Sequence, residues 1–280
     1  MSPRAEDMNF VAIPINPIDI YREPPYPPKP TPRRRPKAVT IAASFQFKGG
    51  IVLCADRMIT HGEATVGQAA FASYEKKIWA RRERGFSVII TGTGTGTTIK
   101  HLKDRIIDRL VVEQGPAEEL YQFPSDVNPK QIVMEELADA FQVIPPTDGA
   151  DLLIAVNDYH RGLTALHTSD SIMNTAKPAE ALGLGENSLI GFLLDNSYSE
   201  LLAYAKAVSL GALVVYTAKS YCPQYCGGLT DIYALRTEDR TVFEVPRNRI
   251  DDLELFFKTA IPLQLDSLLS EAATLVQPTP

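Results

Sequence analysis

The sequence predicts an α+β fold in which antiparallel sheets stack on each other and helices cover their outer faces. The first observation is the alternation of apolar with small or polar residues over Thr40–Phe47, the period of two expected of a strand. The second is the strand Ile51–Ala55, which is apolar throughout and therefore needs cover on both faces. The third is the order of elements: strands and helices come in groups, without regular βαβ alternation.

The first elements form an antiparallel series. The opening hairpin turns at Gly49 and Gly50, because glycine readily adopts the positive φ of a tight turn. Arg57–Tyr74 is polar and predicted to be a loop. Two more strands come next, over Glu75–Trp79 and Phe86–Ile90, and extend the antiparallel pattern.

A glycine-rich stretch, Thr91–Thr98, connects the last of these strands to an amphipathic helix over Ile99–Leu110. It resembles a phosphate-binding loop, but it lacks the GK[ST] ending and does not fit GxGxxG. Close backbone packing or an oxyanion-binding turn therefore explains these glycines better than nucleotide binding does.

The rest of the chain continues with grouped helices and strands. A helix should begin at Asn128, with Pro129 in its first turn and Gln131 completing a capping box. Small residues over Ala179–Gly185 predict a close backbone approach. The remaining predicted elements are strands at Asp151–Val156 and Leu163–His167, a helix at Ser199–Ser220 broken near Gly211, a hairpin at Leu229–Leu235 and Thr241–Val245, and a helical region at Asp251–Leu275.

Composition narrows the class of protein. With 280 residues, 45% hydrophobic and 22% charged, the chain is typical of a globular protein that can bury a sizeable core. The net charge of -6 argues against general nucleic-acid binding. The longest apolar run, Val208–Val215, is too short to cross a membrane, and prolines interrupt Phe10–Ile20 where a secretory signal would be continuous. We therefore expect a cytoplasmic location.

The three cysteines cannot all pair within one chain, and Cys54 lies in a core strand. Cys222 and Cys226 alone are too few for a tetrahedral metal site, so no metal or other cofactor is expected. Residues 1–38 hold nearly half of the 21 prolines and predict a disordered extension. The extension is either a partner-binding arm or a pro-segment whose removal exposes the start of the folded chain.

Three residues could carry chemistry if the fold brings them together. A threonine hydroxyl is a weak nucleophile unless a base takes its proton, and the α-amino group of a chain beginning at Thr40 could be that base. A buried lysine would keep the site electropositive, and a carboxylate would hold the lysine in place. Lys77 and Asp56 suit these roles. Neighbours on a strand face opposite sides, so only one of Lys76 and Lys77 can reach Thr40, and we expect it to be Lys77, which the resemblance described below also implies.

These residues and their spacing resemble the proteasome β-subunits and their N-terminal-nucleophile (Ntn) hydrolase relatives. The resemblance covers about residues 40–260: Thr40–Asp56, Lys76–Ile78, the Gly92 stretch, Gly183–Gly185 and Gly227–Gly228. It implies a four-layer αββα sandwich in which Thr40 is the nucleophile, with Asp56 and Lys77 as its active-site partners. The backbone N–H of Gly92 would serve the oxyanion hole.

The chain departs from the family pattern at several positions. Leu184 replaces the serine between two glycines, Pro223 replaces an aspartate, and Cys226 replaces a serine. Val39 stands where the family has glycine before the nucleophile. These changes remove polar support and the usual processing signal, but they leave the proposed nucleophile, lysine and aspartate in place.

The resemblance implies a proteolytic function. The first interpretation is an N-terminal threonine peptidase that acts on polypeptide inside a ring of self-associated subunits, with other proteasome-like subunits or an ATPase as possible partners. The second is a non-catalytic subunit of such an assembly, and a third is a nucleotide-binding module. The expected organisation is the extension over residues 1–38, an Ntn-hydrolase domain over 39–260, and a C-terminal helix with a Pro-rich tail over 261–280.

Overall fold

The computed structural model describes residues 40–61, 71–114, 123, 127–143, 149–169, 172–183, 188–197 and 202–275. The predicted extension over residues 1–38 lies outside this part of the chain, as do Val39, Leu184 and the end of the expected tail. The described residues form antiparallel sheets and five helices, which confirms the predicted α+β class.

One five-stranded antiparallel sheet, which we call the hairpin sheet, has the strand order β10-β1-β2-β11-β12. Its strands are β1 Ile41–Phe47, β2 Gly50–Asp56, β10 Ala179–Gly183, β11 Thr230–Arg236 and β12 Val242–Glu244. Strands β1 and β2 are the predicted opening hairpin, and Gly49 has a φ of 93° in its turn. Every residue of β2 is buried, as its apolar sequence predicted.

A second five-stranded antiparallel sheet, the lysine sheet, has the order β5-β6-β7-β8-β9. Its strands are β5 Ile78–Arg82, β6 Phe86–Gly94, β7 Ala150–Asp158, β8 Gly162–Ser169 and β9 Ile172–Thr175. A separate pair, β3 Met58–His61 and β4 Phe71–Tyr74, lies where a loop was predicted. For these residues the prediction was wrong, because each strand is only four residues long and is defined by its pairing with the other.

The five described helices are α1 Gly96–Glu113, α2 Pro129–Val143, α3 Ser188–Ser197, α4 Tyr204–Tyr221 and α5 Arg247–Leu275. The start of α2 confirms the predicted cap, since the Asn128 side-chain oxygen accepts a hydrogen bond from the Lys130 N–H at 2.9 Å. The capping box is wrong, because Gln131 donates its side-chain amide to Glu135 instead.

Helix α4 runs unbroken through Gly211, contrary to the predicted break. A Cβ at Gly211 would lie 3.3 Å from the sulfur of Cys54 in β2, so this glycine lets the helix lie close to the sheet. Burial raises the pKa of the Cys54 thiol to about 12, which makes it a small apolar group in the core, as expected.

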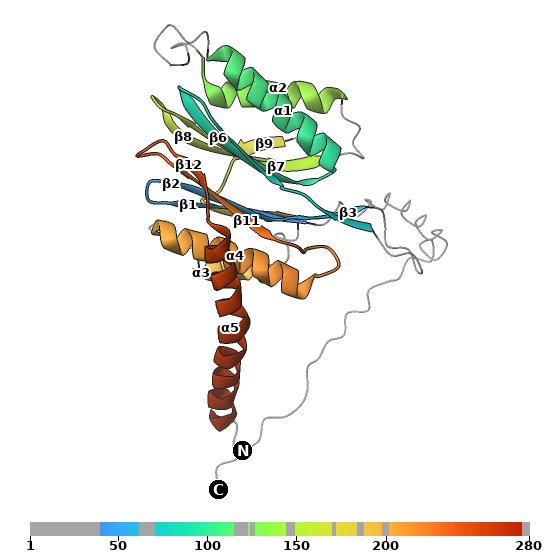
Figure 1. The fold of residues 1–280 in the computed structure, drawn as a ribbon, viewed down its shortest axis with the longest axis vertical. Coiled ribbons are helices and arrows are strands. Elements are labelled where there is room, and N and C mark those ends of the chain that lie inside the picture. Colours follow the sequence, from blue (N-terminus) through green and yellow to red (C-terminus); the bar gives the residue numbers. More distant parts are fainter. Residues whose placement is uncertain are drawn as a thin grey trace, which may run out of the picture. The chain divides into compact units, whose positions relative to one another are not determined.

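Three clusters of buried side chains hold these elements together. One fills the space between the hairpin sheet and helix α4, and a second lies between the lysine sheet and helices α1 and α2. The third joins the facing sides of the two sheets. In Figure 1, α1 and α2 lie beyond the lysine sheet, whereas α3 and α4 lie beyond the hairpin sheet. The candidate site lies where the two sheets face each other.

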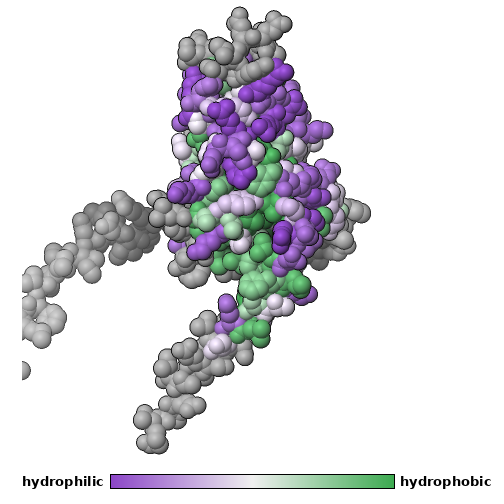
Figure 2. All heavy atoms as spheres, turned by 60° about the vertical axis from the view of Figure 1, so that its left-hand side comes forward, coloured by the Kyte–Doolittle hydropathy of each residue, from purple (hydrophilic) through white to green (hydrophobic). Residues whose placement is uncertain are grey.

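Helix α5 carries exposed apolar residues on its middle turns. These are Leu255, Phe256, Ile261 and Leu263, of which Leu263 is 71% exposed. Figure 2 shows hydrophobic residues gathered over the lower part of the molecule, where α5 lies. None of the helices in the described part of the chain combines the length and hydrophobicity needed to cross a membrane.

Candidate active site

Thr40 is the first described residue and lies immediately before β1, while Asp56 is the last residue of β2. An antiparallel hairpin brings the start of its first strand beside the end of its second. The Thr40 hydroxyl consequently donates a hydrogen bond to Asp56 Oδ1 at 2.6 Å. Both side chains are buried, Thr40 with 7% exposure and Asp56 with none.

Both carboxylate oxygens of Asp56 accept hydrogen bonds. Oδ1 accepts hydrogen bonds from Thr40 Oγ1, from Lys77 Nζ at 2.8 Å and, at 3.4 Å, from the Ile41 N–H. Oδ2 accepts the backbone N–H groups of Met58 at 3.1 Å and Gly227 at 3.0 Å. A buried carboxylate with this many donors is held in one orientation.

Lys77 reaches the same point from the other sheet. It lies just before β5, is 6% exposed, and its ammonium contacts Thr40 Oγ1, Asp56 Oδ1 and the Met58 carbonyl oxygen. Burial lowers the pKa of Lys77, while the charge and hydrogen bond of Asp56 oppose this shift. The geometry therefore brings together the three residues predicted from the sequence and turns Lys76 away.

Gly92 lies inside β6 rather than in a turn. Its pairing partner on β7, Leu152, donates its N–H to Thr168 on β8, so Gly92 and Leu152 do not bond each other. The Gly92 N–H therefore faces the side of β5, whose pairing with β6 ends one residue earlier, at Ile78 opposite Thr91. A Cβ at Gly92 would lie 2.6 Å from the carbonyl oxygen of Asp151, so close packing also requires glycine here.

The predicted glycine-rich turn is absent from the described chain between β6 and α1. Strand β6 runs to Gly94 and α1 begins at Gly96, so Thr95 alone separates the two elements. Thr95 makes no side-chain cap bond. The connection between β6 and α1 is therefore a single residue and not an eight-residue loop, and the nucleotide-binding alternative stays a hypothesis.

Cys226 lies next to these residues in the turn between α4 and β11. It is 1% exposed, and burial raises its thiol pKa; Asp56 raises it further, whereas Lys77 lowers it. The thiol is therefore protonated near neutral pH, and its S–H group is a weaker hydrogen-bond donor than the hydroxyl of a serine. Pro223, in the same turn, has no N–H to donate. Leu184 lies outside the described residues.

The sequence-based prediction missed two groups at the site and anticipated a third. The missed groups are the main chain of Met58 and the N–H of Gly227, for which the side-chain types carry no signal. The close backbone approach predicted over Ala179–Gly185 is confirmed, because a Cβ at Gly183 would lie 2.1 Å from the Thr40 carbonyl oxygen. Among the residues that the structure describes, no three His, Cys, Asp or Glu side chains gather as metal ligands.

Comparisons with known proteins support the fold. No protein-family model matches the chain, and no curated protein matches it. A Gly-1 mutant of Anbu from Hyphomicrobium sp. strain MC1 matches with a TM-score of 0.63 and 14% identity, covering 86% of this chain and 99% of that one. Anbu from Yersinia bercovieri, named as an ancestral beta-subunit, matches with a TM-score of 0.61 and 12% identity over the same shares. At such low identity the likeness shows the fold alone: the chain has the fold of the Anbu proteins.

Proposed function

We propose that this chain is a proteasome-β-like N-terminal threonine peptidase that hydrolyses peptide bonds. The observation that carries this proposal is the buried Thr40 hydroxyl, which contacts both the Asp56 carboxylate and the Lys77 ammonium, while these two also contact each other. A lone buried lysine is costly, so a cluster of this kind at a strand end is more typical of a functional site than of a core.

The proposed reaction begins once the bond before Thr40 has been cleaved. The free α-amine takes the hydroxyl proton, and Thr40 Oγ1 forms a bond to the carbonyl carbon of the substrate peptide. The Gly92 N–H donates to the oxygen that becomes negative, while Lys77 keeps the surroundings electropositive. The amine then gives its proton to the leaving nitrogen as the C–N bond breaks, and water hydrolyses the resulting ester.

The proposed setting is a ring of self-associated subunits, with other proteasome-like subunits or an ATPase as possible partners and a cytoplasmic location. The exposed apolar residues of α5 support self-association, and the solved Anbu proteins include one named as a subunit. The three buried clusters support the four-layer αββα arrangement. We retain the predicted boundaries, with the domain over residues 39–260 and the C-terminal segment over 261–280.

The test is maturation, because an amide nitrogen at Thr40 cannot act as a base. We expect the assembled wild-type protein to yield some chains that begin at Thr40, with peptide hydrolysis. Val39→Gly should speed their appearance, since a β-branched residue resists the tight backbone geometry of self-cleavage. Thr40→Ala should keep the extension. Intact-mass spectrometry reads all three, and retention of residues 1–39 in both wild type and Val39→Gly, without hydrolysis, would exclude the peptidase.

The second candidate is a non-catalytic subunit of a proteasome-like assembly. Cys226 and Pro223 favour it, because they put a thiol that donates hydrogen bonds weakly and an apolar ring where the family has polar side chains. In that case the chain should assemble while Thr40 is never exposed as an N-terminus. The maturation experiment therefore decides between the two candidates.

A further inference from the structure

The turn Cys222–Gly228, which joins α4 to β11, contacts the Asp56 carboxylate oxygen that Thr40 and Lys77 leave free. The N–H of Gly227 donates to Asp56 Oδ2 at 3.0 Å, and the Gly227 carbonyl oxygen accepts the Met58 N–H at 3.2 Å. The same Met58 N–H also lies 3.1 Å from Asp56 Oδ2. The turn and the chain after β2 thus hold one carboxylate oxygen, while the other faces Thr40.

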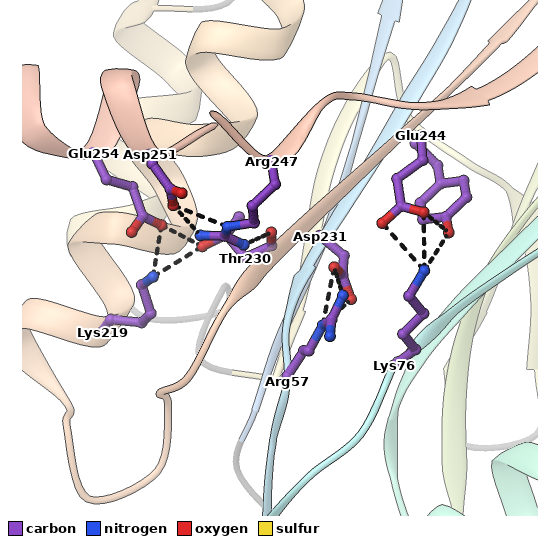
Figure 3. A network of polar contacts seen from close by, with 10 residues as sticks. Arg57, Lys76, Lys219, Thr230, Asp231, Glu244, Arg247, Asp251 and Glu254 are labelled. Carbon is purple, nitrogen blue, oxygen red and sulfur yellow. Dashed lines mark hydrogen bonds and ion pairs between the residues drawn. The ribbon is translucent and has the colours of Figure 1, made fainter. Parts of the chain in front are cut away.

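Two features besides the contact with Asp56 restrict the conformation of this turn: the backbone of Gly228 and the hydrogen bonds of Lys219. Gly228 has a φ of +69°, and a Cβ there would lie 2.5 Å from the ring of Tyr74 on β4. Lys219 at the end of α4 donates to the Gly228 carbonyl oxygen at 3.3 Å and to the Thr230 hydroxyl at 2.9 Å. Figure 3 shows Lys219 meeting Thr230 and Glu254, and its ammonium lies 2.6 Å from the Glu254 carboxylate.

We infer that the turn Cys222–Gly228 is a positioning element for Asp56, and that Gly228 and Lys219 are the positioning residues on which its placement depends. This inference rests on the proposed peptidase function and adds residues that touch neither the substrate nor the reacting atoms. Thr230 is paired directly with Asp56 across β11 and β2, so the Lys219 cluster lies at the strand end that carries the carboxylate.

Displacement of the turn should change the orientation of Asp56 and, through Asp56, the pKa of Lys77. If Gly227 moves away, Oδ2 keeps only the Met58 N–H, so the carboxylate is held less firmly in its orientation. The charge and hydrogen bond of Asp56 then oppose the effect of burial on Lys77 less strongly, so the pKa of Lys77 falls further. A displacement of about 1 Å in a catalytic group can cost about 100-fold in rate. The effect should therefore appear in kcat and in the pH profile, with little change in KM.

The first experiment compares Gly228→Ala with Gly162→Ala in the full chain. Gly162 also has a positive φ, +87°, but nothing lies within 4 Å of its added Cβ, so it shares the backbone strain without the Tyr74 contact or the link to Asp56. We expect Gly228→Ala to lower kcat at least about tenfold and to shift the pH profile, whereas Gly162→Ala stays within about twofold of wild type. Adding Tyr74→Ala should restore part of the loss if Gly228→Ala alone folds poorly.

The second experiment approaches the turn from α4. Lys219→Met removes the ammonium that holds the Gly228 carbonyl, and Lys206→Met, at an exposed position on the same helix, is the matched control. We expect Lys219→Met to lower kcat several-fold with the same direction of shift in the pH profile, and Lys206→Met to leave both unchanged.

A readout without hydrolysis separates this inference from the proposed function. Competitive acetylation as a function of pH, followed by mass spectrometry, reports the reactivity of Lys77 against its exposed neighbour Lys76. In Gly228→Ala and Lys219→Met, Lys77 should react at lower pH while Lys76 stays the same. Unchanged Lys77 acetylation and an unchanged kcat in both variants would overturn the inference. Absence of peptide hydrolysis by the wild-type chain would contradict the peptidase proposal. The acetylation of Lys77 in the two variants would still decide whether the turn positions Asp56.

Discussion

Lys76 and Lys77 are neighbours in the chain but differ in exposure, in their ion-pair partner and in the direction of their pKa shift. The side chain of Lys76 is 46% exposed and lies 2.9 Å from the Glu244 carboxylate and 3.1 Å from the Tyr233 hydroxyl (Figure 3). The side chain of Lys77 is 8% exposed and lies 2.8 Å from Asp56. The hydrogen bond to Glu244 raises the pKa of Lys76, whereas burial lowers that of Lys77.

Side-chain direction, and not residue type, therefore sets the chemistry of these two lysines. Successive residues of an extended chain point to opposite sides, so one lysine enters the space between the sheets and the other meets β12. An exposed ion pair contributes little to stability, while a buried ammonium must be paired to be tolerated. Three measurements test this contrast between the two lysines.

The largest expected effect is on hydrolysis. Lys77→Ala should lower kcat/KM at least about 100-fold, because it removes the charge beside Thr40. Lys76→Ala should stay within about twofold of wild type, since Lys76 contacts Glu244 and Tyr233 at the surface. Steady-state cleavage of a fluorogenic peptide by the assembled protein measures both. If Lys76→Ala abolishes hydrolysis and Lys77→Ala does not, the assigned register of these two residues is wrong.

The next effect is on the free energy of unfolding. Asp56→Asn should destabilise the fold by about 3–5 kcal/mol, because it leaves the Lys77 ammonium buried beside an amide. Glu244→Gln should cost at most about 1 kcal/mol, since its partner Lys76 stays in contact with water. Urea unfolding at one fixed protein concentration measures the two values. Equal losses in the two variants would mean that burial does not distinguish the pairs.

The smallest effect is on the pH dependence of stability. The pKa of Lys77 in the fold lies below its ordinary value of 10.5, so the unfolded chain binds more protons between these two values. Stability therefore rises with pH in that window, and Lys77→Met should remove this rise. The pKa of Lys76 is raised, so its small contribution is present below 10.5 and is lost as pH rises through its folded value. The urea midpoint of each variant is compared with that of wild type as pH rises. Relative to wild type, the midpoint should fall for Lys77→Met and rise for Lys76→Met.

Several parts of the fold were predictable because their signals are local. The alternation before Gly49 predicts β1, and the apolar run after it predicts a strand buried on both faces, as β2 is. Alternation around β5 also required Lys76 and Lys77 to point to opposite sides, and Lys77 is the one that contacts Thr40. Predictions failed where a local signal had more than one structural use: Gly211 permits close packing in α4 instead of breaking it, and Gly92 lies within a strand instead of a turn.

Residue pattern alone was enough for the α+β class and the opening hairpin, because alternation and turn residues act over a few positions. Thr40, Asp56 and Lys77 were selected through the resemblance to the proteasome β-subunits, since alternation does not say which distant side chains meet. How Asp56 is held became visible only in three dimensions. Its Oδ2 accepts the N–H of Gly227, which is 171 positions away in the chain. A backbone donor is common to nearly every residue, so no side-chain pattern marks it, and it reaches Asp56 because the turn after α4 lies against the end of β2.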